Sequence, residues 1–309
     1  MPTSPTGVIL MTYGSATTSK DVEPFLQHVY PQADSELIAE FKRRFDIVGS
    51  SPLVEITVAQ AAALQKLLSR LAPQQQYLVE AGMLHSKPFI EDAVKKLKSL
   101  GCTQIIGILL SPQYSPHIMR GYVDGLSAAA SQNGFDKRDV NMVGPWATEP
   151  KFIQMLASEL LTLRTKLAEK YDQNLPVIFT THSLPENVVK RDPSYLDQLA
   201  QTAQAVASQA DLAESDYTTA YQSAGHTPEE WLKPDLNDVI ADVKTKAVPA
   251  VIVVPIQFLA DHLEILYDLD TAAREETQNL GVDYYRLPVA NTNPLFIEAL
   301  SDIVIRQQA

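Results

Sequence analysis

The sequence predicts an α/β protein that consists of two doubly wound units, each a parallel sheet covered by helices, with a cleft between the units. Short apolar runs alternate with longer amphipathic stretches, and this pattern restarts after about residue 150. Runs such as 250–254 are apolar at every position, which is typical of strands that are buried on both faces. A chain of 309 residues also suggests two domains. We place them at 1–150 and 151–309.

The first unit begins with an apolar strand that Gly14 closes, so that Tyr13 lies at its carboxyl end. An amphipathic helix follows with Ser35 as the expected N-cap and with Arg43 and Arg44 in its last turn, where cations suit the helix dipole. The expected strands of this unit are 7–14, 77–84, 104–110 and 141–143, and the expected helices are 22–28, 35–45, 56–71 and 90–100.

The second unit repeats the alternation of strands and helices. Its expected strands are 176–180, 217–221, 250–254 and 282–287, and its expected helices are 149–171, 194–210 and 294–307. Pro255 has no N–H to donate to a sheet and therefore ends the third of these strands. Ser183 and Glu186, three residues apart, match a capping box at the start of a helix.

Composition narrows the classes of function. The net charge of −12 argues against a nucleic-acid partner and permits a cation as substrate. Cys102 is the single cysteine, which excludes an intrachain disulfide and a cysteine-rich zinc or iron–sulfur site. The sequence has neither a signal-peptide pattern nor an apolar run of about 20 residues. We therefore expect a cytoplasmic protein without a transmembrane segment, and a monomer by default.

Chemically distinctive residues follow the strand 250–254. They are Asp261, His262, Glu264, Asp268 and Asp270. Ligands of open parallel sheets bind beyond the carboxyl ends of the strands, so this group suggests that the protein handles a cation, protons or both. The alternative is a solvated, acidic start of a helix with a surface histidine.

A second histidine has a comparable position. The capping box accounts for Ser183 and Glu186, but it does not account for His182 at the carboxyl end of a buried strand. A lone histidine there is usually a hydrogen-bonded structural residue. Because His182 and the pair His262 and Glu264 lie at the ends of strands of one sheet, a shared site is favoured.

Three motifs resemble the ferrochelatase family. They are THSLP at 181–185, QSAGHTP at 222–228 followed by WLKPD at 231–235, and ADHLEILYD at 260–268. Further matches are MTYG at 11–14, SPL at 51–53 and PFIED at 88–92, so the resemblance covers essentially the whole chain. It is strongest to the Gram-positive branch that inserts iron into coproporphyrin III, of which Tyr13 is a mark. The resemblance implies a lyase with two Rossmann-like, chelatase-like domains that enclose a porphyrin cleft.

The resemblance also implies roles for individual residues. His182 would be metal ligand and proton acceptor, with Glu264 as its catalytic and metal-binding partner across the cleft. Tyr13 would lie on the opposite face of the porphyrin. The remaining substrate-binding residues would be Arg44, Phe45, Ser51 and Tyr122, with Lys87 as a further candidate. A helix-dipole role stays the alternative for Arg44.

Two departures limit the resemblance. Ala272 stands where relatives continue an acidic helix face, and Tyr30 and Pro31 stand where relatives carry arginines. A secondary metal site and one propionate contact are therefore in question. Ferrous iron is expected as substrate, with no prosthetic group and no iron–sulfur cluster. The alternatives are a protoporphyrin IX ferrochelatase, a cobaltochelatase, which would rely on a histidine-rich site, and a non-catalytic porphyrin or haem carrier.

Overall fold

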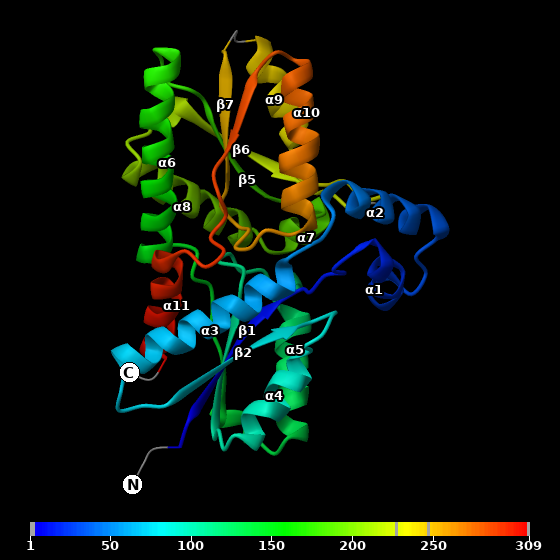
Figure 1. Ribbon diagram of the computed structural model, residues 1–309, viewed down its shortest axis with the longest axis vertical. Coiled ribbons are helices and arrows are strands. Elements are labelled where there is room, and N and C mark those ends of the chain that lie inside the picture. The colour runs from blue at the N-terminus through cyan, green and yellow to red at the C-terminus, as the bar shows by residue number, and fades with distance from the viewer. Residues whose placement is uncertain (1–3, 226–227, 246–247, 308–309) are drawn as a thin grey trace.

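The computed structural model describes residues 4–225, 228–245 and 248–307 and contains two four-stranded parallel sheets with flanking helices (Figure 1). The strand order is β2-β1-β3-β4 in the first sheet and β6-β5-β7-β8 in the second. Every strand pair is parallel. The predicted fold class of two doubly wound α/β units is confirmed.

The first sheet matches the predicted strands closely, because its three longer strands are predominantly apolar. Its strands are β1 (Thr6–Thr12), β2 (Tyr77–Met83), β3 (Gln104–Leu109) and β4 (Val140–Met142). The helices around it are α1 (Val22–Val29), α2 (Ser35–Val48), α3 (Leu53–Leu71), α4 (Ile90–Ser99) and α5 (Pro116–Gln132). Helix α5 was not predicted, although Ser115 caps it by accepting from the His117 N–H and Pro116 occupies its first turn.

The second sheet consists of β5 (Val177–His182), β6 (Tyr217–Gln222), β7 (Ala250–Pro255) and β8 (Asp283–Arg286). Its helices are α6 (Pro150–Tyr171), α7 (Glu186–Arg191), α8 (Ser194–Gln209), α9 (Leu236–Thr245), a π-helix (Ile265–Ala273) that continues into α10 (Arg274–Asn279), and α11 (Pro294–Arg306). Strand β7 ends at Pro255 as predicted. Strand β5 extends further than predicted, so that His182 is its last residue.

Two predicted helix caps are wrong. The N-cap of α2 is Asp34, whose carboxylate accepts from the Leu37 N–H, because Asp34 rather than Ser35 has extended backbone angles. The capping box at Ser183 does not form, since the Ser183 hydroxyl donates to the Leu232 carbonyl and Pro185 is the N-cap of α7.

One hydrophobic core crosses from the first sheet to the second. Its members include Val8 of β1, Phe152 of α6 and Phe179 of β5. Helix α11, at the end of the chain, packs against both α3 and α6 and so lies beside the first half (Figure 1). The sheets fall on either side of residue 150, but the division into domains at that residue stays a prediction.

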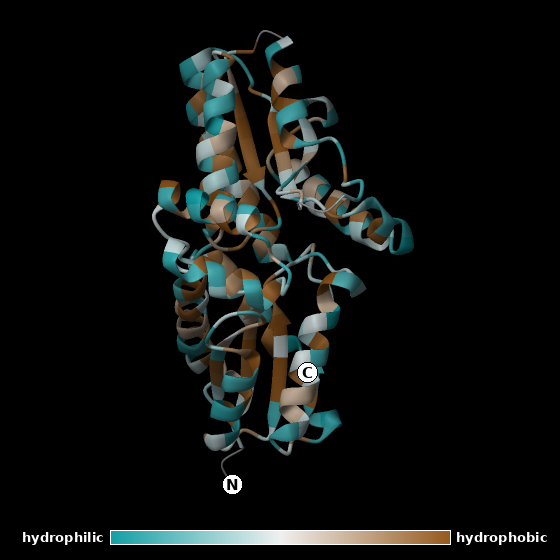
Figure 2. Cartoon of the chain, turned by 90° about the vertical axis from the view of Figure 1, so that its right-hand side faces the viewer, coloured by the Kyte–Doolittle hydropathy of each residue, from teal (hydrophilic) through white to brown (hydrophobic). Residues whose placement is uncertain are grey.

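Helices α1 and α2 form a flap beside the sheets, with a small core of its own (Figure 1). Leu26 and Phe45 of the flap are buried together with Leu263 from the segment after β7. Figure 2 shows the apolar strands inside and polar helix faces outside. Within the described residues, no individual helix has the length and apolar character to cross a membrane; α2 and α3 pass that test only jointly, and they are bent by 61°.

Candidate active site

Two neighbouring strands bring the predicted imidazole and carboxylate groups together. Strands β5 and β7 are paired up to Thr180 and Pro255, so the segments that follow them leave the sheet side by side. His182 Nε2 lies 3.7 Å from Glu264 Oε2. His182 and Glu264 are thus adjacent at one sheet edge rather than on opposite sides of a cleft, which corrects the sequence-based expectation.

His262 faces the same carboxylate oxygen. Its Nε2 lies 3.5 Å from Glu264 Oε2, and its Nδ1 lies 3.0 Å from the Ala260 carbonyl. The Nδ1 of His182 similarly lies 2.5 Å from the Ser183 carbonyl. A carbonyl only accepts hydrogen bonds, so Nδ1 carries the proton in both rings. In the neutral rings Nε2 then has a free lone pair that can bind a metal ion.

The electrostatic environment keeps Glu264 ionised. Burial works to raise the pKa of Glu264, but the positive charge of His182 and His262 in their protonated form, a hydrogen bond from His262 and the charge of Arg44 outweigh it and hold this pKa at about 2. Burial likewise works to lower the pKa of His262, whereas its contact with Glu264 prevails and raises that pKa. Glu264 is therefore suited to hold a cation and is a weak proton acceptor.

Asp268 has the opposite environment. Burial raises its pKa to about 6, although the Ser223 hydroxyl donates to its carboxylate and Arg44 Nη1 lies 3.6 Å away. Ser223 adopts a left-handed backbone conformation (φ 57°), which is rare for a non-glycine residue and places its hydroxyl against Asp268. A carboxylate with a pKa near the working pH is a suitable proton acceptor.

The remaining acidic residues of this segment do not join the site. Asp261 and Asp270 both contact Arg286 of β8. The five polar groups that the sequence suggested as one cation-handling cluster therefore divide into a site group of His262, Glu264 and Asp268 and a structural pair of aspartates.

Tyr13 enters the site from the first sheet. It follows β1, remains 44% exposed and has its ring 4.5 Å from the ring of His85, which follows β2. Burial and the nearby Tyr30, and to a smaller extent Glu264, raise the pKa of Tyr13. His28 stacks edge-on against His85 at 5.4 Å. Sequence reasoning missed His85 and His28, although the position of His85 after a buried strand was a usable signal.

Arg44 of α2 is already paired in the structure. Its Nε lies 2.8 Å from Glu40, and its guanidinium lies 4.9 Å above the ring centre of Tyr267 on the π-helix. Together with the contact to Asp268, these interactions link the flap to the π-helix. An incoming carboxylate that binds Arg44 must compete with Glu40 and Asp268.

The other predicted substrate-binding residues are mostly buried. Phe45 is 2% exposed in the core of the flap, which identifies it as a packing residue. Ser51 is 3% exposed and accepts a hydrogen bond from the Ser15 hydroxyl at 2.9 Å. Tyr122 of α5 is 4% exposed, and burial followed by the proximity of Tyr13 raises its pKa. Lys87 is exposed.

The stretch 222–231, whose glycine, proline and aromatic residues suit the wall of a cleft, begins next to His182, because Gln222 is the strand partner of His182. The ring of Trp231 packs over Gly225, where a Cβ atom would lie 2.6 Å from the indole. Only glycine fits beneath the indole. His226 and Thr227 of this motif lie outside the described residues.

The described residues contain no group of three or more His, Cys, Asp or Glu side chains arranged to hold a metal ion. His182, His262 and Glu264 lie close together, but they do not form such a three-ligand group. At Ala272, in the π-helix, the side chain has no oxygen to bind a metal.

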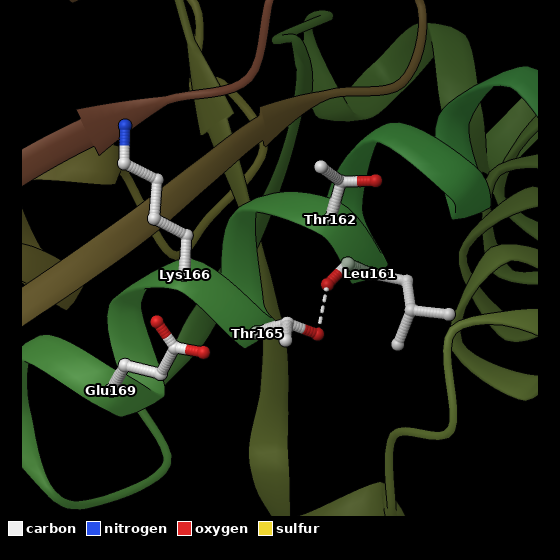
Figure 3. Close-up of a pocket in the computed structure, with 5 residues that line it drawn as sticks. All are labelled: Leu161, Thr162, Thr165, Lys166 and Glu169. Carbon is white, nitrogen blue, oxygen red and sulfur yellow. Dashed lines mark hydrogen bonds between the residues drawn. The ribbon is translucent and has the colours of Figure 1, made fainter.

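A hollow on the outer face of α6 is unrelated to the site (Figure 3). Its lining residues, Leu161, Thr162, Thr165, Lys166 and Glu169, all belong to one helix. Since no second element contributes a converging polar group, it is a helix surface rather than a binding pocket.

Comparisons with known proteins agree with the geometry. The chain resembles SirB from Bacillus subtilis, solved with Fe³⁺, with a TM-score of 0.58 at 13% identity over 99% of this chain and 96% of that one. It also resembles CbiX, described as the terminal enzyme for siroheme biosynthesis in denitrifying bacteria, with a TM-score of 0.55 at 13% identity over 98% of each chain.

The model of the ferrochelatase family matches residues 5–308. Coproporphyrin III ferrochelatase of Geobacillus kaustophilus is 34% identical over 98% of this chain and 96% of its own length. That of Anoxybacillus flavithermus is 34% identical over 97% and 95%, and coproporphyrin III ferrochelatase 1 of Bacillus anthracis is 31% identical over 98% and 97%.

The two parallel sheets and the imidazole–carboxylate edge define a protein of the chelatase fold. Within that class, the chain belongs to the ferrochelatase family. It is a lyase of the kind that inserts a metal ion into a porphyrin, and its partners are the porphyrin and iron.

Proposed function

We propose that this protein inserts Fe²⁺ into coproporphyrin III and releases two protons. The observation that carries the proposal is the convergence of His182 Nε2 and His262 Nε2 on the ionised carboxylate of Glu264. Neutral imidazole and carboxylate suit ferrous iron. The choice of coproporphyrin III is supported by relatives that carry this substrate in their names.

The reaction requires that iron lose its water ligands and that two pyrrole N–H groups lose their protons. His182 and Glu264 receive the ion, and the imidazole Nε2 of His182 accepts one proton as the iron–nitrogen bonds form. Asp268, with its pKa near 6, is the better placed carboxylate for the second proton, since Glu264 holds protons only weakly.

The propionates of the substrate need donors in an acidic protein. Arg44 offers a planar fork for one carboxylate, and the hydroxyl groups of Ser51 and Tyr122, both buried in the first half of the chain, are the further donors of the proposal. Tyr13 contacts the opposite porphyrin face.

The proposal further includes action as a monomer in the cytoplasm, without a prosthetic group and without an iron–sulfur cluster, which is consistent with one cysteine that is buried.

The test is anaerobic Fe²⁺ insertion followed by absorbance, with coproporphyrin III and protoporphyrin IX compared side by side. A higher kcat/KM for coproporphyrin III supports the proposal. A preference for protoporphyrin IX would show that the proposed substrate is wrong, whereas the proposed mechanism of metal insertion would still hold. If both porphyrins bind and neither takes up metal, the protein is a carrier.

A further inference from the structure

Arg286, the last residue of β8, holds two aspartates from the segment that carries the site. Its Nε and Nη2 bind the two carboxylate oxygens of Asp270, each at 2.7 Å. The same Nη2 lies 3.4 Å from Asp261 Oδ1. The Arg286 side chain is only 13% exposed, so these charged hydrogen bonds are largely shielded from water.

Asn291 holds Asp261 from a second direction. Its amide Nδ2 donates to Asp261 Oδ2 at 2.7 Å, and its Oδ1 accepts from the Asp261 main-chain N–H at 2.9 Å. Its own N–H donates to the Leu259 carbonyl at 3.0 Å. Asn291 has a φ of 42°, a left-handed conformation in which asparagine is tolerated better than most residues. The side chain and the main chain of Asp261 are therefore both fixed.

Asp261 and Asp270 stand at the two ends of the stretch that contains His262, Glu264 and Asp268. The guanidinium of Arg286 thus spans this stretch from end to end. Glu264 itself makes only long contacts with its imidazole neighbours, at 3.5 and 3.7 Å, beyond the usual hydrogen-bond range. The direction of its carboxylate consequently depends on how the surrounding backbone is held.

We propose that Arg286 and Asn291 are positioning residues that fix the Glu264 carboxylate for metal binding by clamping Asp261 and Asp270. The inference rests on the proposed function, in which Glu264 receives the ion. It assigns to these aspartates a role in holding the site and not in binding the ion.

The clamp requires an arginine and not merely a positive charge. The planar guanidinium binds Asp270 with two parallel hydrogen bonds and still reaches Asp261, whereas a lysine ammonium is a compact point charge on a flexible stem. Arg286→Lys therefore keeps the charge and removes the geometry. Arg274→Lys is the matched control, because Arg274 lies 3.9 Å from the same Asp270 but has 43% of its side chain exposed.

The first readout is the affinity of the porphyrin-free protein for Co²⁺, an air-stable dication that imidazole and carboxylate ligands bind. The second readout is the rate of Fe²⁺ insertion. We expect Arg286→Lys to weaken Co²⁺ binding and to lower kcat, each by about 10- to 100-fold, as is usual when a group that orients a metal ligand is lost. The KM for porphyrin should stay within about twofold, and Arg274→Lys should resemble the parent in every readout.

A double-mutant cycle separates positioning from general stability. In a Glu264→Gln background, Arg286→Lys should have no further effect on either readout, since the carboxylate that it positions is gone. Asp261→Asn, which keeps the size of the side chain, should reproduce the loss of Co²⁺ affinity if Arg286→Lys fails to fold.

The proposal is overturned if folded Arg286→Lys or Asp261→Asn binds Co²⁺ as the parent does, or if the loss persists undiminished without the Glu264 carboxylate. Failure of the proposed function has a different signature. The parent would then insert no iron, while the Co²⁺ measurements would still report on the clamp.

Discussion

Glu264 and Asp268 show how neighbouring carboxyl groups acquire opposite properties. The positive charges of protonated His182 and His262 and of Arg44 hold the pKa of Glu264 at about 2, whereas burial raises the pKa of Asp268 to about 6. The first group is thus a permanent anion that can attract a cation, and the second can exchange a proton near neutral pH. This division suits a reaction that takes up a dication and releases protons.

His182 is the residue on which the proposed chemistry depends most directly. Replacement with alanine removes the Nε2 lone pair, and we expect Fe²⁺ insertion to fall by about 10²-fold or more, in the range typical for loss of a proton acceptor. Steady-state insertion assays measure this change. His117→Ala, in an exposed position on α5, is the control and should retain full activity. A His182→Ala variant with parental insertion would contradict the mechanism.

The burial of Asp268 is expected to lower the stability of the folded protein while it supplies a proton acceptor. Ionised Asp268 is less favourable in the folded protein than in the unfolded chain, because its pKa rises from 3.8 to about 6. The folded state therefore loses stability as pH rises through about 6, by up to roughly 3 kcal/mol for such a shift. Asp268→Asn removes this cost, and we expect a higher Tm than the parent at pH 8.

The difference in Tm should shrink as pH falls below about 6 and vanish below the unfolded-state value of 3.8, where both side chains are neutral. Thermal unfolding across this pH range measures it, with Asp46→Asn on the exposed face of α2 as control. The same Asp268→Asn variant should insert iron more slowly. An equal Tm difference at pH 4 and pH 8 would show that burial of the charge is not the cause.

At the scale of single elements, helix α2 connects the flap to the site. Its C-terminal half carries Arg44, which reaches Asp268, and its start depends on the Asp34 cap. Because the flap has its own small core, its stability depends strongly on such local interactions.

We expect Asp34→Ala to destabilise α2 by about 1 kcal/mol, since the Leu37 N–H loses its acceptor. Ser35→Ala should have little effect, because Ser35 is the first helical residue and not the cap. Amide hydrogen exchange in α1 and α2 measures the local change. Equal amide exchange rates in the Asp34→Ala and Ser35→Ala variants would show that Asp34 is not the N-cap of α2.

The π-helix after Glu264 is the other element that shapes the site. π-turns are rare and occur often at functional sites. This one places Asp268 against Ser223 and Arg44 while Glu264 faces the imidazoles. The spacing of four residues predicted only that both carboxylates would share a helix side.

At the scale of the whole molecule, the two sheets are joined through a continuous core. Phe296 of α11 is fully buried, and its ring centre lies 6.3 Å from that of Trp146, which precedes α6. Since α11 also packs against α3, the end of the chain stabilises the first half.

We expect the protein to unfold in one cooperative transition, so that Trp fluorescence and far-UV circular dichroism give the same Tm. Phe296→Ala should lower the free energy of unfolding by about 3–5 kcal/mol through loss of buried surface and creation of a cavity. It should lower the stability of both halves together. Separate transitions for the two probes would indicate two independent domains.

The sequence by itself determined the two-sheet fold, because central strands such as β1 and β7 are apolar runs that can be recognised without tertiary context. It also predicted His182 and Glu264 as site residues, since His182 ends one strand of the second sheet, Glu264 follows another, and both belong to recognisable motifs. The sequence did not reveal α5, because the polar and proline-rich stretch 111–117, in which this helix begins, is typical of a loop.

Tertiary structure alone decided how the polar residues are used. It brought Arg286, distant in the sequence, against Asp261 and Asp270 and so separated these aspartates from the group around Glu264. It buried Phe45, paired Arg44 with Asp268, and set the pKa values of Glu264 and Asp268 apart. The physical reason is that the environment of a charge depends on neighbours contributed by other elements, whereas the apolar pattern of a strand lies within the strand itself.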